Sequence, residues 1–364
     1  MSILKDSSVD IVLQGGMGSG FFCAGFLRCV AEGMQEGWLR LRILRIIANS
    51  TPTLFSAMFL AGRTDMYAEV VESLQPGDIY KFRSTPWREV LYEHLRHPSN
   101  LWPPFISYFF KQRSLFSNEP LKRTIRKHLA SDAVLRVVNS RTNLVISTMD
   151  DRCLFDQERH VKIWETHGAY LQQHPQELYK VLAATTALPV SFPNEEIAQG
   201  YYSDGVLVNC PVHLLPQGDA DAALVVGINF NGDPVADLSH ANWLEHHDKK
   251  QSALVNENTR RMLGQFCDTN NTMRVWEEVK RHIGKEHEEV FRNAEEEFHW
   301  GRRRFIETYF ITNPEPLAEP VINKFSNAQL KVLFDSGYLA TLRMLWDLGL
   351  VPETAAREKL RLFY

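Results

Sequence analysis

Hydrophobic positions in the first sixty residues follow the pattern of alternating strands and helices. Two short apolar runs, Val9–Gln14 and Ile43–Ala48, have the length of buried strands. Each is followed by a segment whose apolar residues recur at helical spacing, Phe21–Glu36 after the first run and Leu54–Ala61 after the second. The N-terminal part of the chain is therefore predicted to be β-α-β-α.

The same alternation continues along the chain. Further strands are predicted at Asn143–Thr148, Ala222–Asn229 and Glu307–Ile311, and helices at Gln176–Thr185, at Trp276–Arg304 and in a final pair from Ser326 to the end. Strands alternating with helices predict an α/β protein with three α/β/α layers and a mostly parallel central sheet. We expect one domain over 1–350, with a helical insertion at about 65–135, a charged helical segment at about 240–305 and a tail at 351–364.

Two turns that carry candidate chemistry follow the first two strands. Gly15-Gly16-Met17-Gly18-Ser19-Gly20 comes after the first strand, and Asn49-Ser50-Thr51-Pro52-Thr53 comes after the second. Sites in parallel sheets lie at the carboxyl ends of strands, where both turns are predicted to be. A strand, a sharp turn with a hydroxyl group and a helix are the layout of an acyl-transfer site.

Composition and charge narrow the class of protein. The 364 residues are 44% hydrophobic and 23% charged with a formal net charge of −4, which is typical of a globular protein and gives no basic stripe for nucleic acid. No apolar run approaches the length of a membrane-spanning helix, and no signal peptide is expected at the N-terminus. The five cysteines form no CxxC pair, which favours reduced thiols and a cytoplasmic location. His246-His247-Asp248 is interpreted as a solvated loop rather than a metal site.

Several segments, in this order, resemble the patatin-like phospholipases, a family of lipid acyl hydrolases. Gly15, Gly16, Gly20 and Gly25 match the glycine-rich turn of that family and its helix. Ser117–Leu121 is similar to a helix entry in the middle of the domain, and Ala183–Pro189 to a stretch just ahead of the catalytic Asp. Asp204-Gly205, followed by Asn209-Cys210-Pro211-Val212, matches the Asp–Gly motif.

The resemblance implies a two-residue mechanism that acts on a lipid or another acyl ester. A Ser attacks the ester carbonyl and an Asp takes its proton directly, while glycine N–H groups hold the oxyanion. Carried onto this chain, the nucleophile is Ser50, the base is Asp204, and the oxyanion donors are the N–H groups of Gly15, Gly16 and Gly18. This mechanism requires no metal and no cofactor.

The turn after the second strand departs from the family's Gly-x-Ser-x-Gly and can be aligned in two ways. Flanking similarity favours Thr51 at the nucleophile position, whereas a shift by one residue puts Ser50 there. Physical chemistry favours Ser50, because a β-branched Thr is the worse occupant of a strained turn. With Thr51 the following residue would be Pro52, which has no N–H to offer an oxyanion. The third glycine of the first turn is also replaced, by Met17, and Ser19 stands where many members have a basic residue.

These departures leave other hypotheses open. One is a catalytically silent patatin-like protein that binds an acyl chain or a partner protein. A less favoured one is an S-adenosylmethionine-dependent methyltransferase, since Gly16-x-Gly18-x-Gly20 follows a strand, although Gln14 stands where that family has an acidic residue. Ser50 alone could be a helix N-cap. The aromatic stretch Trp102–Phe110 is interpreted as core, as a lid, or as a patch that contacts a membrane surface.

Overall fold

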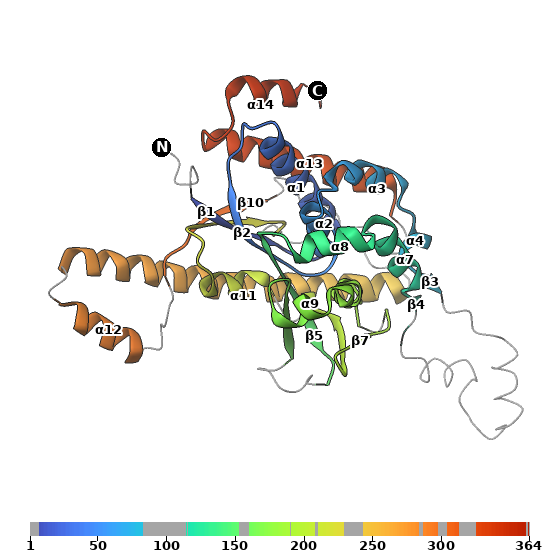
Figure 1. The fold of residues 1–364 in the computed structure, drawn as a ribbon, viewed down its shortest axis with the longest axis horizontal. Coiled ribbons are helices and arrows are strands. Elements are labelled where there is room, and N and C mark those ends of the chain that lie inside the picture. The colour runs from blue at the N-terminus through green and yellow to red at the C-terminus, as the bar shows by residue number, and fades with distance from the viewer. Residues whose placement is uncertain are drawn as a thin grey trace, which may run out of the picture.

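The fold is described from a computed structural model, which covers residues 7–82, 114, 116–152, 160–189, 191–207, 210–228, 243–283, 287–297, 304–312, 325–361 and 363. The aromatic stretch Trp102–Phe110 lies outside the described residues, as do Val208 and Asn209. In Figure 1 a central sheet is covered by helices on both faces, which gives the three layers predicted from the sequence.

The described strands form one large mixed sheet and one small one. Their bounds are β1 (Ser8–Leu13), β2 (Arg42–Ala48), β3 (Lys81–Phe82), β4 (Phe116–Ser117), β5 (Asn143–Asp150), β6 (Val161–Glu165), β7 (Glu195–Ile197), β8 (Gly200–Asp204), β9 (Ala222–Val226) and β10 (Glu307–Ile311). The large sheet has the order β10-β9-β1-β2-β5-β8-β7, with β6 also paired to β5. Strands β10, β9, β1, β2 and β5 are parallel, and the pairs β5–β6, β5–β8 and β7–β8 are antiparallel.

The helices connect these strands and continue to the C-terminus. The α-helices are α1 (Met17–Gln35), α2 (Thr51–Leu60), α3 (Tyr67–Ser73), α4 (Pro76–Ile79), α7 (Glu119–His128), α8 (Ser131–Val138), α9 (Ala169–Gln173), α10 (Leu178–Ala184), α11 (Trp243–Ile283), α12 (Glu288–Glu297), α13 (Asn327–Asp347) and α14 (Glu353–Leu360). Short 3₁₀ helices are η1 (Thr64–Met66), η2 (Pro175–Glu177), η3 (Gly205–Leu207) and η4 (Pro211–Gln217).

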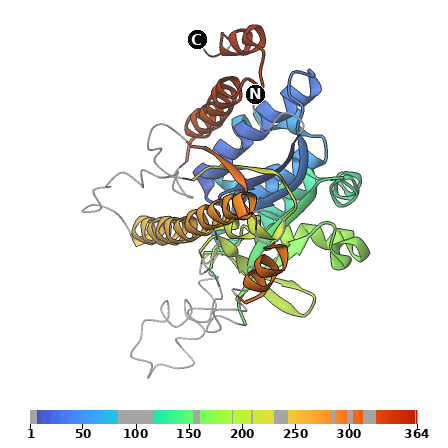
Figure 2. The ribbon, with the colours of Figure 1, turned by 90° about the vertical axis from the view of Figure 1, so that its left-hand side faces the viewer.

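Alternate residues of the central strands point into two separate cores. On β1, Ile11 and Leu13 belong to the larger core with α1, α2 and α13, whereas Val12 belongs to the smaller core with η4 and α11. This period of two is what a strand covered on both faces requires. Figure 2, turned by 90° from Figure 1, shows α1 and α13 on one side of the sheet and α11 on the other.

Helix α13, near the C-terminus, is part of the main domain because it packs closely on α1. Gly25 of α1 leaves no room for a side chain against the backbone oxygen of Phe334, and Gly337 of α13 leaves none against the backbone oxygen of Phe22. Two glycines facing each other's helix in this way let the two backbones approach closely. The glycine at position 25, matched to the family by sequence, therefore serves helix packing.

Two predicted boundaries differ from the structure for a physical reason. The glycine turn was expected to precede its helix, but α1 begins at Met17, so Gly18, Ser19 and Gly20 form the first turn of the helix. Within the charged helical segment expected at about 240–305, a helix was placed at Trp276–Arg304, but the structure has α11 at Trp243–Ile283 and α12 at Glu288–Glu297. Among the residues of α11 whose side chains the structure describes, only a few, such as Leu263 and Phe266, are buried, so the apolar pattern of this helix is weak.

Candidate active site

A strained serine lies at the turn between β2 and α2. Ser50 has φ 57° and ψ −146°, a backbone conformation that is essentially restricted to glycine. Among the described residues, the other non-glycine residues with positive φ are Ala198 and Gln199, in the hairpin between β7 and β8. Ser50 therefore has the conformation expected of a residue held on a sharp strand-to-helix turn.

The hydroxyl group of Ser50 is not used to cap the helix. Ser50 occupies the N-cap position of α2, but its side chain makes no capping hydrogen bond within the described structure; the turn is closed by the backbone, Thr53 N donating to Ser50 O at 3.0 Å. Thr51 is the first residue of α2, and Pro52 follows in its first turn, where the missing N–H costs nothing. Ser50, and not Thr51, therefore has the strained backbone conformation in this turn.

The glycine turn lies directly against Ser50. Gly16 is the N-cap residue of α1 and has φ 130°, which only glycine adopts without strain. A Cβ added to Gly15 would lie 3.0 Å from Ser50 Cβ and 2.8 Å from Val206 Cγ2, and one added to Gly20 would lie 2.6 Å from Thr51 Cβ. The glycines therefore allow the N-terminus of α1 to touch both the serine turn and the turn after Asp204. Gly18 is buried as the second residue of α1.

Sheet register brings Asp204 to the level of Ser50. Ala48 of β2 pairs with Ile146 of β5, so Ser50 comes two residues after one member of this pair and Thr148 two residues after the other. Thr148 in turn pairs with Asp204 at the end of the antiparallel strand β8. Residues more than 150 positions apart in sequence thus reach the same edge of the sheet.

Asp204 is a fully buried carboxyl group. Its Oδ1 accepts a hydrogen bond from Val206 N at 2.9 Å, and its own N–H donates to Ala187 O at 2.9 Å. Burial is the largest influence on its pKa and raises it to about 7, against which the neighbouring Ser50 hydroxyl and the hydrogen bond from the Val206 N–H act to lower it. A carboxyl group with a pKa near 7 is a stronger base than an exposed aspartate.

The contact between the two side chains is loose. The Ser50 hydroxyl is near enough to lower the pKa of Asp204, yet Oδ2 of Asp204 has no hydrogen bond of good geometry to any described residue. The two groups are therefore neighbours and do not form a hydrogen-bonded pair in this structure. Catalytic hydrogen bonds are often long in the absence of substrate and tighten when it binds.

Thr185 is a site residue that the motif analysis did not single out. Its hydroxyl accepts a hydrogen bond from Ser50 N at 2.9 Å and donates one to Ser147 O at 3.0 Å, and the residue is fully buried. The same Ser147 carbonyl lies against Gly205, where a Cβ would be 2.9 Å from it. Thr185 lies in the segment Ala183–Pro189 that resembles the family, so the sequence indicated that this segment is near the site. No local pattern indicates that its hydroxyl binds the backbone of Ser50.

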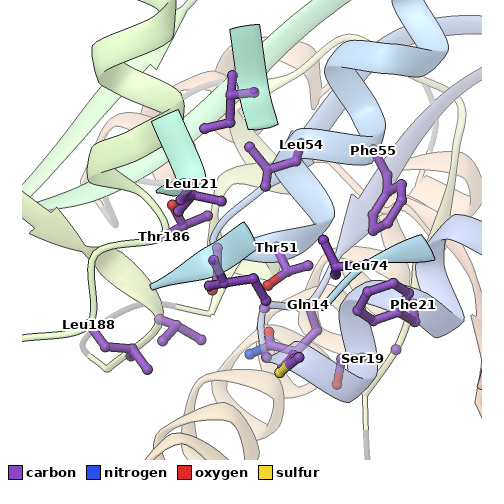
Figure 3. A pocket seen from close by; sticks show the side chains of 18 of the residues that line it. Gln14, Ser19, Phe21, Thr51, Leu54, Phe55, Leu74, Leu121, Thr186 and Leu188 are labelled. Atoms are coloured by element: carbon purple, nitrogen blue, oxygen red, sulfur yellow. The ribbon is translucent and has the colours of Figure 1, made fainter. Parts of the chain in front are cut away.

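A cavity of about 200 Å³ opens in front of Ser50 and the glycine turn. Figure 3 shows Gln14 and Ser19 on one side of Thr51, and Leu54 and Phe55 on the other. The apolar lining of the cavity comes from α1, α2, α7 and the C-terminal end of α3 and includes Phe21, Leu54, Phe55, Leu74, Leu121 and Ile125. The cavity therefore places the strained serine beside a mainly apolar surface.

Fold and site together define an α/β protein with a strained serine at a strand-to-helix turn. The sequence model of one family, described as patatin-like phospholipase, matches residues 11–216, more than half of the chain. The chain therefore belongs to the patatin-like phospholipase family, a family of lipid hydrolases. The match covers Gly16-x-Gly18-x-Gly20, so these glycines belong to the patatin-like turn rather than to a methyltransferase motif.

Among solved structures, the chain is similar to the crystal structure of VipD from Legionella pneumophila. The two chains are 10% identical with a TM-score of 0.41, and the alignment covers 94% of this chain and 67% of that one. No curated protein sequence matches the chain. Among the described helices, none combines the length and the apolar character needed to cross a membrane.

Proposed function

We propose that this protein is an acyl hydrolase or acyltransferase that acts on a lipid ester or thioester through Ser50 and Asp204. One observation carries the proposal: a serine in a glycine-like backbone conformation lies beside a buried carboxyl group whose pKa is raised to about 7. Strain of this kind costs about 1–3 kcal/mol and persists where a site requires it. Family membership supports the same class of reaction.

In the proposed reaction, Ser50 Oγ attacks the carbonyl carbon of the ester while Asp204 takes the hydroxyl proton. The carbonyl oxygen becomes an oxyanion, held by the N–H groups of Gly15, Gly16 and Gly18 at the N-terminus of α1, where the helix dipole also favours negative charge. Collapse of this intermediate breaks the bond to the leaving oxygen or sulfur, which receives the proton from Asp204. Water, or an acceptor alcohol in a transferase, then attacks the acyl-Ser50 ester with Asp204 as base and restores the serine.

Labelling with a fluorophosphonate tests the nucleophile directly. Wild-type protein is expected to be labelled and to hydrolyse a p-nitrophenyl acyl ester, with tandem mass spectrometry placing the label on Ser50. Ser50→Ala should lose both, and Asp204→Asn should lose most of both while remaining folded. Thr51→Val, which removes the competing hydroxyl and keeps the branched side chain, should still be labelled. A label on Thr51, or undiminished hydrolysis by Ser50→Ala, would overturn the assignment.

A catalytically silent protein that binds an acyl chain in the same cavity is the second candidate. Met17 in place of the third glycine favours it, because the Met17 side chain lines the cavity where the family has no side chain. A folded wild type that takes up no fluorophosphonate but binds a fatty acid would select this candidate. If the protein is instead an acyl hydrolase or acyltransferase, the folded wild type is labelled.

A further inference from the structure

One side chain in the cavity wall has an unsatisfied hydrogen-bonding group. Gln14 follows β1 and is 3% exposed, and its Nε2 donates to Thr259 Oγ1 at 3.1 Å. Its Oε1 is buried and has no hydrogen-bond partner among the described residues. A buried amide atom without a partner is unfavourable, and native structures rarely retain one without a use.

Gln14 is held next to the proposed nucleophile. Its backbone N–H donates to Val226 O at 3.0 Å, which fixes the residue at the end of β1. The next residue, Gly15, is the one that lies against Ser50. The terminal torsion of a glutamine side chain has a broad energy minimum, so the amide can turn its unpartnered atom toward a molecule in the cavity.

The partner of Gln14 belongs to α11, which lies beyond the family match at residues 11–216. Val255, Asn256 and Thr259 of α11 line the same cavity as Gln14. This wall brings together an amide, a hydroxyl and a second amide, whereas the wall formed by α2, α3 and α7 is mainly apolar. We call the part of the lining from Gln14 and α11 the polar side and the part from α2, α3 and α7 the apolar side; Ser50 and Thr51 line the same cavity.

The chemistry of the amide indicates what the polar side binds. Thr259 Oγ1 can donate as well as accept, so either end of the Gln14 amide can face it, and the unpartnered atom is either the oxygen or the nitrogen. A hydroxyl group can donate a hydrogen bond to the amide oxygen or accept one from the amide nitrogen. An acyl chain would take the apolar side, so the hydroxyl would belong to the alcohol part of the ester.

We propose that Gln14, with Asn256 and Thr259, forms a subsite for a free hydroxyl group on the alcohol part of the substrate, as in a partly esterified polyol. The placement of this hydroxyl relative to the acyl chain rests on the proposed function. A site built to hydrogen-bond a hydroxyl discriminates strongly against an analogue that lacks it, because the polar groups of the site then stay unpaired.

Binding of two matched amides tests the subsite without requiring catalysis. N-(2-hydroxyethyl)octanamide and N-propyloctanamide differ only in a hydroxyl group replaced by a methyl group, and amides are cleaved far more slowly than esters. By isothermal titration calorimetry, wild type is expected to bind the hydroxyl compound at least tenfold more tightly. Gln14→Met and Thr259→Val should each reduce this ratio to below threefold and leave binding of the propyl compound within threefold of wild type.

Thr272→Val is the matched control, since Thr272 lies on the same helix, exposed, with its hydroxyl bonded to Asp268 O. It should keep the wild-type ratio. Equal binding of the two amides by wild type, binding of neither, or a preference that persists in Gln14→Met would overturn the subsite. The wild-type comparison needs no variant to fold. If wild type is not labelled by the fluorophosphonate, the proposed function is overturned. The subsite is then still tested by the ratio of the two amide affinities, which does not depend on catalysis.

Discussion

The hydroxyl group of Thr185 accepts a hydrogen bond from the backbone N–H of Ser50 at 2.9 Å and passes one on to the carbonyl oxygen of Ser147 at 3.0 Å. This bridge ties the strained turn after β2 to strand β5. Strand β5 also pairs with β8, whose last residue is Asp204. One buried hydroxyl therefore connects the two strands that position the proposed nucleophile and base.

Replacing Thr185 with Val should loosen this arrangement. The variant keeps the shape of the side chain and leaves a buried N–H without its partner, which costs about 1–3 kcal/mol. We expect kcat for a p-nitrophenyl ester to fall roughly 10- to 100-fold with KM little changed, because a misplacement of the nucleophile acts on the chemical step. Thr185→Ser keeps the hydroxyl and should recover most of kcat. Equal kcat for wild type and Thr185→Val would show that the turn at Ser50 keeps its conformation without the hydrogen bond to Thr185.

The pH dependence of activity should follow Asp204. Its pKa is raised to about 7 by burial, and only the ionised carboxylate can accept the Ser50 proton. We therefore expect kcat/KM to rise about tenfold per pH unit below pH 7 and to level off above it. A profile of ester hydrolysis between pH 5 and 9, read at a wavelength where product absorbance does not vary with pH, measures this. A midpoint near 4 would mean that the base is another, exposed carboxylate.

The same shift makes a prediction about stability. Because the pKa of Asp204 is higher in the folded state than the usual value of about 3.9, folding favours the protonated form. This contribution is fully present below pH 4 and is lost as the pH rises through 7. Asn cannot ionise, so Asp204→Asn should gain stability relative to wild type between pH 4 and 8, by at most about 4 kcal/mol.

Urea unfolding of Asp204→Asn and wild type at pH 5 and pH 8 measures this difference, and titration of all other groups cancels between the two proteins. If the difference in unfolding free energy between Asp204→Asn and wild type becomes smaller as the pH rises, the raised pKa of Asp204 is contradicted.

A side chain at Gly15 should disable the site. A Cβ there would lie 2.5 Å from Asn49 Oδ1 and 3.0 Å from Ser50 Cβ, so Gly15→Ala must displace the serine turn or the glycine turn. We expect fluorophosphonate labelling to slow by at least 100-fold. Gly264→Ala on α11 is the control, because a Cβ at that exposed position meets nothing within 4 Å. It should keep full labelling and gain up to about 1 kcal/mol of stability, as alanine is favoured over glycine inside a helix.

Close packing of α13 on α1 should contribute strongly to the stability of the fold. Gly337→Ala would push a methyl group into the backbone oxygen of Phe22 and should destabilise the protein by about 3 kcal/mol or more. Gly77→Ala in α4, where a Cβ meets nothing within 4 Å, should stay close to wild type. Thermal denaturation followed by circular dichroism compares the two. Similar melting temperatures for both variants would mean that α13 can move away from α1.

Much of the fold could be predicted from the chain because buried parallel strands leave a local signal. The runs that became β1, β2, β5, β9 and β10 are short, apolar and bounded by turns, so their periodicity identifies them without tertiary information. The antiparallel strands β6, β7 and β8 were not predicted as separate strands. They are short, and β8 contains Gly200 and the exposed Tyr201, so its pattern is weak.

Local sequence also determined which residues carry candidate chemistry: the glycine turn, the two neighbouring hydroxyls at Ser50 and Thr51, and Asp204-Gly205. The residue types alone favoured Ser50 over Thr51 for the strained position, but only the tertiary structure shows that Ser50 has this conformation. It also decided that Asp204 is buried, that Thr185 holds Ser50, and that α11 brings Thr259 to Gln14. The physical reason is common to all of these: burial, pKa and hydrogen bonding between distant segments depend on contacts made only after the sheet is assembled.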